Sequence, residues 1–91
     1  MTRKELTDKA KEVWDNMLCY EFDFDFVLDE YEITKESAEA DAEHMLEGED
    51  GVGYRSQIFE CFKNEEIGFI DMDALKAYMQ SALAKALVAR L

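Results

Sequence analysis

The residues of this chain that are best able to act chemically are carboxylates, and they are gathered in one stretch. Residues 21–50 contain thirteen Asp and Glu residues and one base, Lys35, whereas residues 1–20 and 51–91 each have as many bases as acids. The whole formal charge of −12 therefore belongs to the middle third. Charge repulsion opposes folding, so its concentration in so few residues indicates that a surface of single sign has a function.

Part of this stretch has the spacing of a repeating anionic surface. Four glutamates stand three or four residues apart and share one face of an expected helix, namely Glu36, Glu39, Glu43 and Glu47. At a rise of about 1.5 Å per residue, their heights differ by roughly 4.5–6 Å, which resembles the pitch of phosphates along one strand of a duplex. If residues 21–26 are extended, Asp23 and Asp25 share one side, about 6.8 Å apart.

We take the acids before, within and after this helix as candidate partner-binding residues. They are Asp23, Asp25, Asp29, Glu30, Glu32, Glu36, Glu39, Glu43, Glu47, Glu49 and Asp50. An acidic helix face is also a common solvated surface, and that interpretation stays open here. Carboxylates copy the charge of phosphates rather than their shape, so the natural complement of this surface is a protein groove built to hold nucleic acid.

Size and composition predict one folded domain over residues 1–91. The apolar share of 48% and the eleven aromatic residues are too high for a disordered acidic tail. The alanine and leucine residues of the C-terminal half also offer surface for a homodimer. The pI near 4.3 disfavours direct binding to nucleic acid or to an anionic membrane.

The N-terminal residues and the two cysteines bear on location. No long apolar run follows the N-terminus, so we expect neither a secretory signal nor a membrane span. Cys19 and Cys61 do not make a disulfide framework, and buried, reduced thiols are the simplest interpretation. Together these features predict a cytoplasmic protein.

The hydrophobic periodicity predicts a mainly α-helical bundle of about four helices. The first helix has one apolar stripe, formed by Leu6, Ala10, Val13, Trp14, Met17 and Leu18. Thr2 and Glu5 fit a capping box at its start. A second helix is expected over 35–47, with Thr34 as N-cap and Ile33 as staple residue. A third is expected over about 53–64, burying Ile58, Phe59 and Phe62, and a fourth from Asp71 or Asp73 to about Arg90.

Residues 19–28 are ambiguous. The run from Glu21 to Phe26 alternates acid and phenylalanine, which is the period of a strand. A two-stranded element would pair residues 21–27 with residues 68–71. The alternative, which we favour, is an extended or irregular link whose phenylalanines dock on the helices. One of these phenylalanines is also a candidate anchor for a partner.

No residue pattern in the chain predicts catalysis, a cofactor or a metal site. The stretch from Ile58 to Met79 has the hydrophobic skeleton of an EF-hand, but Lys63 and Ala74 stand where calcium needs carboxylates. His44 is the only histidine, and we expect it at the surface. Cys61 lies among Ile58, Phe59 and Phe62, which indicates core packing rather than a nucleophile. We therefore expect a non-enzymatic protein.

The organisation of the chain resembles the small acidic anti-restriction proteins of phages and plasmids that mimic bent duplex DNA, the Ocr group. The likeness lies in a short N-terminal helix, an acid-rich middle, and a helix with Tyr54, Ile58 and Phe59 that precedes a hydrophobic C-terminal helix. The long acidic tail typical of Ocr is missing, so the mimicked duplex would be shorter. The resemblance implies an inhibitor of a restriction enzyme, a CRISPR effector or another DNA-handling protein.

Two functions from different classes remain after the sequence is read. The first is an inhibitor that occupies the DNA- or RNA-binding groove of a basic target protein by electrostatic competition. The second is an acidic adaptor or regulatory protein that binds a basic protein surface without imitating nucleic acid. Competition by added nucleic acid separates them, because only a mimic is displaced.

Overall fold

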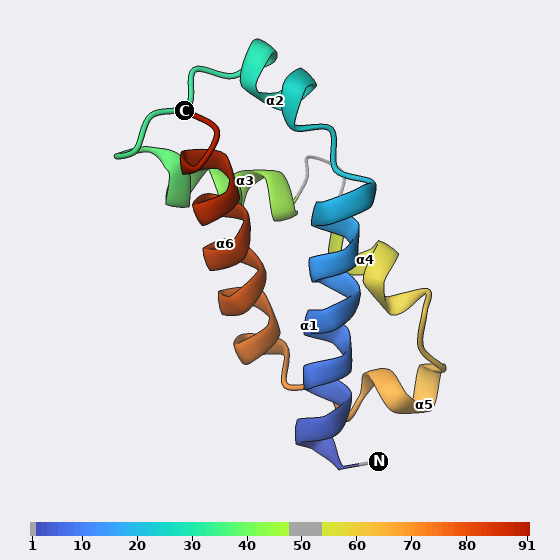
Figure 1. Ribbon diagram of the computed structural model, residues 1–91. Helices are drawn as coiled ribbons and strands as arrows, with labels where there is room; N and C mark the ends of the chain where they lie inside the picture. The colour runs from blue at the N-terminus through green and yellow to red at the C-terminus, as the bar shows by residue number, and fades with distance from the viewer. Residues whose placement is uncertain (1, 48–53) are drawn as a thin grey trace.

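The computed structural model describes residues 2–47 and 54–91 of the chain. Within these ranges it has no strand and six helices, which are α1 (Arg3–Tyr20), α2 (Phe24–Glu30), α3 (Ala38–Glu47), α4 (Tyr54–Phe59), α5 (Asn64–Ile67) and α6 (Met72–Val88). α1 and α6 lie side by side along the long axis, and α3 packs across α6 (Figure 1). The mainly α-helical fold expected from the sequence is confirmed.

α1 forms because its sequence satisfies both its first turn and its buried face. The Thr2 hydroxyl accepts a hydrogen bond from the Glu5 backbone N–H at 3.1 Å and donates to Glu5 Oε1 at 3.0 Å. Thr2 is therefore the N-cap, as predicted, while the Glu5 carboxylate of the predicted capping box accepts from the Thr2 hydroxyl. Of the predicted stripe, Leu6, Ala10 and Trp14 are buried, and the other three residues are partly buried.

α6 begins after Asp71, one of the two caps that the sequence offered. The Asp71 carboxylate accepts a hydrogen bond from the Ala74 backbone N–H at 3.1 Å, which satisfies one of the free amides of the first turn. The Asp71 backbone N–H donates to the buried hydroxyl of Thr7 at 3.0 Å, and that hydroxyl donates to the Arg3 carbonyl at 2.8 Å. This chain of hydrogen bonds ties the start of α6 to α1.

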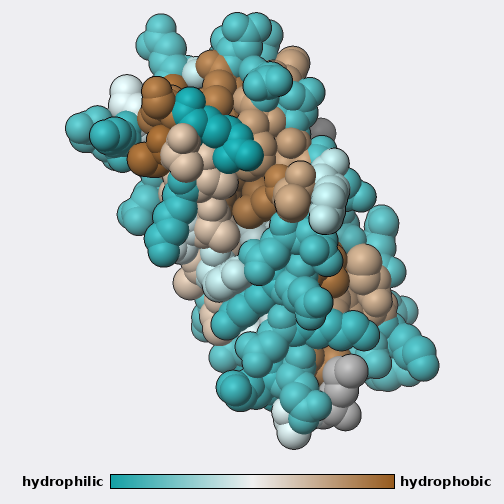
Figure 2. Space-filling model, in the orientation of Figure 1, coloured by the Kyte–Doolittle hydropathy of each residue, from teal (hydrophilic) through white to brown (hydrophobic). Residues whose placement is uncertain are grey.

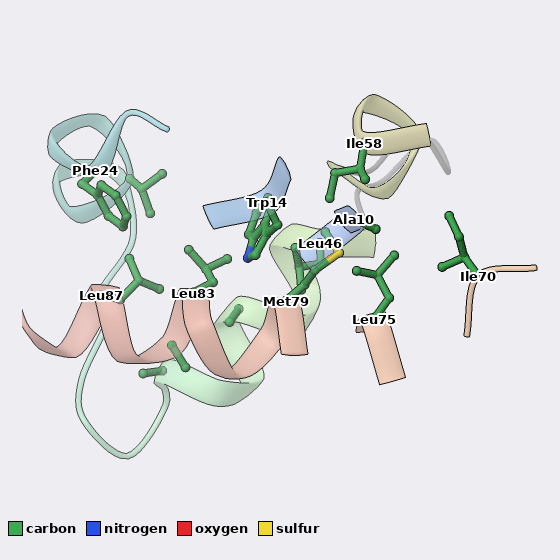
Figure 3. Packing of buried hydrophobic residues seen from close by; sticks show 14 of the residues in the cluster. Ala10, Trp14, Phe24, Leu46, Ile58, Ile70, Leu75, Met79, Leu83 and Leu87 are labelled. Atoms are coloured by element: carbon green, nitrogen blue, oxygen red, sulfur yellow. The ribbon is translucent and has the colours of Figure 1, made fainter. Parts of the chain in front are cut away.

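The core lies where α1, α3, α4 and α6 meet. Figure 3 shows Trp14 pointing from α1 toward Leu83 and Met79 of α6. All three side chains are fully buried, as are Leu46 and Ile58 from α3 and α4. Full burial of one such aliphatic side chain stabilises the fold by about 1.5–3 kcal/mol. The Trp14 indole N–H has no hydrogen-bond partner among the described residues. Burying this unpaired donor costs free energy, which offsets part of the stabilisation from the buried ring.

Residues 24–30 form a helix, so neither a strand nor an extended or irregular link describes this stretch, although Phe22 and Phe24 do pack against the core as the second interpretation expected. The strand pair of residues 21–27 with residues 68–71 is not formed, because the second segment is the turn between α5 and α6. The Asp23 carboxylate caps α2 by accepting from the Phe26 backbone N–H at 3.0 Å. Phe24 and Val27 stand three residues apart and are buried, which places Phe26 outward, 58% exposed. A local cap and helical spacing therefore outweigh the alternation.

Two other expectations need correction. The second helix begins at Ala38, because Thr34 and Ser37 bond to each other's backbone N–H at 3.1 and 2.9 Å and hold residues 35–37 in a turn. The third helix ends at Phe59. Two short-range hydrogen bonds, from the N–H groups of residues 61 and 62 to the carbonyls of residues 58 and 59, tighten the chain there.

The cysteines do not lie where the sequence suggested. Phe62 is buried after the tightened turn, but Cys61 is turned outward and is exposed. Cys19 is exposed as well, near the end of α1. The expectation of buried thiols was therefore wrong, and both are free cysteines at the surface.

Candidate functional site

The candidate acids are on the surface wherever the structure describes them. Nine of the eleven fall in the described ranges, and all nine are exposed. Glu49 and Asp50 lie outside the described residues. The nine are distributed over α2 and its N-cap Asp23, the residues that link α2 to α3, and α3 itself. Figure 1 shows α2 across the end of the bundle that carries the C-terminus, and α3 behind α6. Figure 2 shows hydrophilic residues over most of this face, with hydrophobic residues among them at the same end of the bundle.

The acids of α2 stand on a short helix without a nearby base on that helix. Asp25 and Asp29 are four residues apart and therefore neighbours on its surface, and Glu30 is its last residue. One carboxylate oxygen of Asp23, which precedes α2, accepts the hydrogen bond that caps the helix. Repulsion between like charges one turn apart destabilises a helix by about 0.2–0.5 kcal/mol, so the pair of Asp25 and Asp29 destabilises α2.

The acids of α3 form a row along the helix. Glu39, Glu43 and Glu47 follow one another at intervals of four residues, which spans about 12 Å along the helix axis. Glu36 was expected on this helix, but it lies in the preceding turn because α3 begins at Ala38. The row is therefore one carboxylate shorter than the sequence predicted.

Part of this row is neutralised by a base from another third of the chain. The Lys76 ammonium of α6 lies 3.9 Å from Glu43 Oε1 and 2.6 Å from Glu47 Oε1. Lys35 is the one base within residues 21–50 of the sequence, but the fold brings Lys76 to these acids from α6. Sequence position alone could not show this, because the contact joins residues 29 apart.

The remaining acids define what we call the open acidic surface. It consists of Asp25, Asp29, Glu30, Glu32, Glu36 and Glu39. With the lysines and arginines whose side chains the structure describes, these six form no ion pair. The exposed Glu21, at the C-terminal cap of α1, was not among the candidates although it precedes them directly.

A cavity lined largely by aromatic side chains adjoins these acids, and sequence reasoning did not identify it. We call it the aromatic groove; it has a volume of about 260 Å³ and its walls include Phe22, Asp23, Phe26, Tyr31 and Tyr54. Phe26 and Tyr31 are 58% and 50% exposed. The four-residue step from Phe22 to Phe26 was the only sequence signal for it, and the strand-like alternation hid it.

Tyrosine side chains form one side of this groove. The Tyr54 ring is packed against Phe22 and Trp14, with centroid distances of 5.5 and 5.7 Å. Burial raises the pKa of the Tyr54 hydroxyl above its ordinary value of 10.0, and the electrostatic effect of Tyr31 raises it further. The Tyr54 hydroxyl is therefore neutral at physiological pH, and the groove places aromatic rings and the His44 imidazole beside the Asp23 carboxylate.

On another side of α2, an aromatic ring already holds a cation. The Arg90 guanidinium carbon lies 3.7 Å from the centroid of the Phe24 ring, and its Nη1 donates to the Ala86 carbonyl at 3.0 Å. Asp23 and Asp25 line the same cavity as Arg90. The sequence gave no reason to pair residues so far apart.

Comparison with known protein families, with curated proteins and with solved structures finds no match to this chain. Within the described ranges, no group of three or more His, Cys, Asp or Glu side chains is placed to hold a metal ion. None of the helices described is long and apolar enough to cross a membrane. His44 is exposed, as expected from the sequence.

Proposed function

We propose that this protein is a non-enzymatic inhibitor that occupies the nucleic-acid-binding groove of a basic target protein, such as a restriction or CRISPR enzyme. The single observation that supports this most is the open acidic surface. Six exposed carboxylates within fifteen consecutive residues are left without a described basic partner. The basic side chains of a groove that holds phosphates would attract all six carboxylates at once.

The proposed mechanism is electrostatic competition. The lysines and arginines of the target face the carboxylates in place of phosphates, which speeds association and makes affinity fall steeply with salt. Because Lys76 neutralises Glu43 and Glu47, contact would centre on α2, residues 31–37 and the first turn of α3. Such a surface covers only a few phosphate steps, which agrees with a short mimic.

The test is inhibition of a panel of purified restriction and CRISPR enzymes acting on labelled duplex DNA. We expect inhibition of at least one enzyme at low salt, its relief by excess unlabelled duplex, and its loss near 0.5 M NaCl. At that concentration the Debye length is only about 4 Å, so surface attraction is largely screened. Inhibition that is unchanged by salt and by competitor DNA would contradict groove competition.

A charge-reversal pair separates the proposed surface from net charge. In the test variant, Asp29, Glu36 and Glu39 become lysine; in the control, Glu12, Glu60 and Glu65 become lysine. All six residues are exposed, and both variants change the net charge equally. We expect the test variant to lose inhibition at least tenfold more than the control, because attraction becomes repulsion only at the contact. Equal losses would mean that net charge alone acts.

The acidic adaptor remains as a second candidate, and the aromatic groove favours it. Phosphate mimicry needs no exposed Phe26 or Tyr31, whereas binding to a protein surface commonly uses aromatic anchors. An adaptor that docks outside a nucleic-acid groove would stay bound when duplex or single-stranded competitor is added. The competition experiment therefore distinguishes the two functions directly.

A further inference from the structure

The aromatic groove beside α2 combines features that favour a cation with a flat face. Phe26 and Tyr31 are 58% and 50% exposed, while Phe22 and Tyr54, which also line the groove, are half-buried. Asp23 contributes a carboxylate, of which Oδ1 accepts the Phe26 backbone N–H. Ionised carboxylates have about four acceptor positions, so the cap leaves capacity for another donor.

The protein itself shows how α2 binds such a cation. On the Phe24 side, the Arg90 guanidinium stacks 3.7 Å from the ring centroid and shares a cavity with Asp23 and Asp25. On the Phe26 side, an aromatic ring and Asp23 are again adjacent. Within the residues that the structure describes, no cation stacks on Phe26 or Tyr31.

We propose that the aromatic groove takes an arginine side chain of the basic protein that contacts the open acidic surface. This inference rests on the proposed function, since it identifies one contact of the same partner. The guanidinium would lie over the Phe26 or Tyr31 ring and donate to the Asp23 carboxylate. Arginine suits this position better than lysine, because its planar guanidinium both stacks on rings and presents several donors.

Charge complementarity argues for arginine over an apolar side chain. The groove opens beside the most acidic part of a chain whose net charge is −12, so a cation gains from the surrounding carboxylates. An apolar side chain would pack against the aromatic rings of the groove, but it could not donate a hydrogen bond to the Asp23 carboxylate. A ligand that carries phosphate groups is disfavoured in the groove, because the surrounding carboxylates would repel it.

The test uses the full chain and two defined probes, hexa-arginine and hexa-lysine peptides, with affinities measured by calorimetry at low salt. We expect hexa-arginine to bind about two- to fivefold more tightly, the range for one cation–π contact at an exposed site. Phe26→Ala should abolish this difference and leave hexa-lysine binding unchanged. Phe69→Ala is the matched control, because Phe69 is 62% exposed and is not among the residues that line the groove.

The outcomes separate this inference from the proposed function. If both peptides bind equally and Phe26→Ala has no effect, the arginine site is refuted while the acidic surface retains its function. If neither peptide binds, both proposals fail. A peptide of five lysines and one phenylalanine that binds more tightly than hexa-arginine would assign the groove to an apolar anchor. Sedimentation showing a dimer that Phe26→Ala dissociates would assign it to a second copy.

Discussion

Lys76 stands at the one point where α6 neutralises the acidic row of α3, and its replacement by glutamine has a calculable cost. The ammonium lies 3.9 Å from Glu43 and 2.6 Å from Glu47, and its side chain is 33% exposed. Partly exposed ion pairs contribute about 0.2–1 kcal/mol each, and the unmasked repulsion between the two glutamates adds about 0.2–0.5 kcal/mol. We therefore expect Lys76→Gln to lower the free energy of unfolding by about 0.5–2.5 kcal/mol.

Thermal and urea unfolding in 20 mM and 1 M NaCl would measure this cost. A loss of 1 kcal/mol corresponds to a fall in Tm of roughly 4–8 °C for a domain of this size. The loss should shrink at high salt, where the Debye length is about 3 Å. The control is Lys85→Gln, since Lys85 lies on the same helix, is exposed and has no described ion pair. Equal effects of the two variants, or a salt-independent loss, would refute the reasoning.

Three further predictions concern the packing of α6. Leu83→Ala should cost about 2–5 kcal/mol because Leu83 is fully buried, and urea unfolding measures it. Asp71→Ala should cost about 0.5–2 kcal/mol by removing the helix cap, which thermal unfolding would show as a lower Tm. Two hydrogen-bond contacts of 2.9 Å to Asp15 raise the pKa of Tyr78 above 10.0, so its stabilisation is present at neutral pH and is lost as pH rises through the folded-state pKa. Tyr78→Phe should therefore weaken the alkaline fall in stability in a pH series of unfolding curves.

The longest helices could be predicted because their local signals and their packing agree. In α1, the Thr2 cap and the apolar stripe both indicated the same start and the same buried face. In α6, the start lies at Asp71, one of the two caps that the sequence offered, and Leu75, Met79 and Leu83 share one buried side at helical spacing. Each of these features lies within a few residues of sequence, so no tertiary information was needed.

The short elements could not be predicted because tertiary packing and local caps decided them. The alternation around Phe24 indicated a strand, but a strand without a partner leaves backbone groups unpaired, and Asp23 offered a helix cap instead. The exposure of the candidate acids followed from their charge. Their pairing with Lys76 and the stacking of Arg90 on Phe24 did not, because these contacts join distant segments.

The buried indole of Trp14 gives the molecule its own optical reporter. The chain has one tryptophan, so its fluorescence comes from a single, completely enclosed position. Unfolding would expose that ring to water and shift its emission to longer wavelength. Because its neighbour Tyr54 also lines the aromatic groove, with ring centroids 5.7 Å apart, a ligand that displaces Tyr54 would alter the same signal. Stability and occupancy can thus be followed in one unlabelled sample.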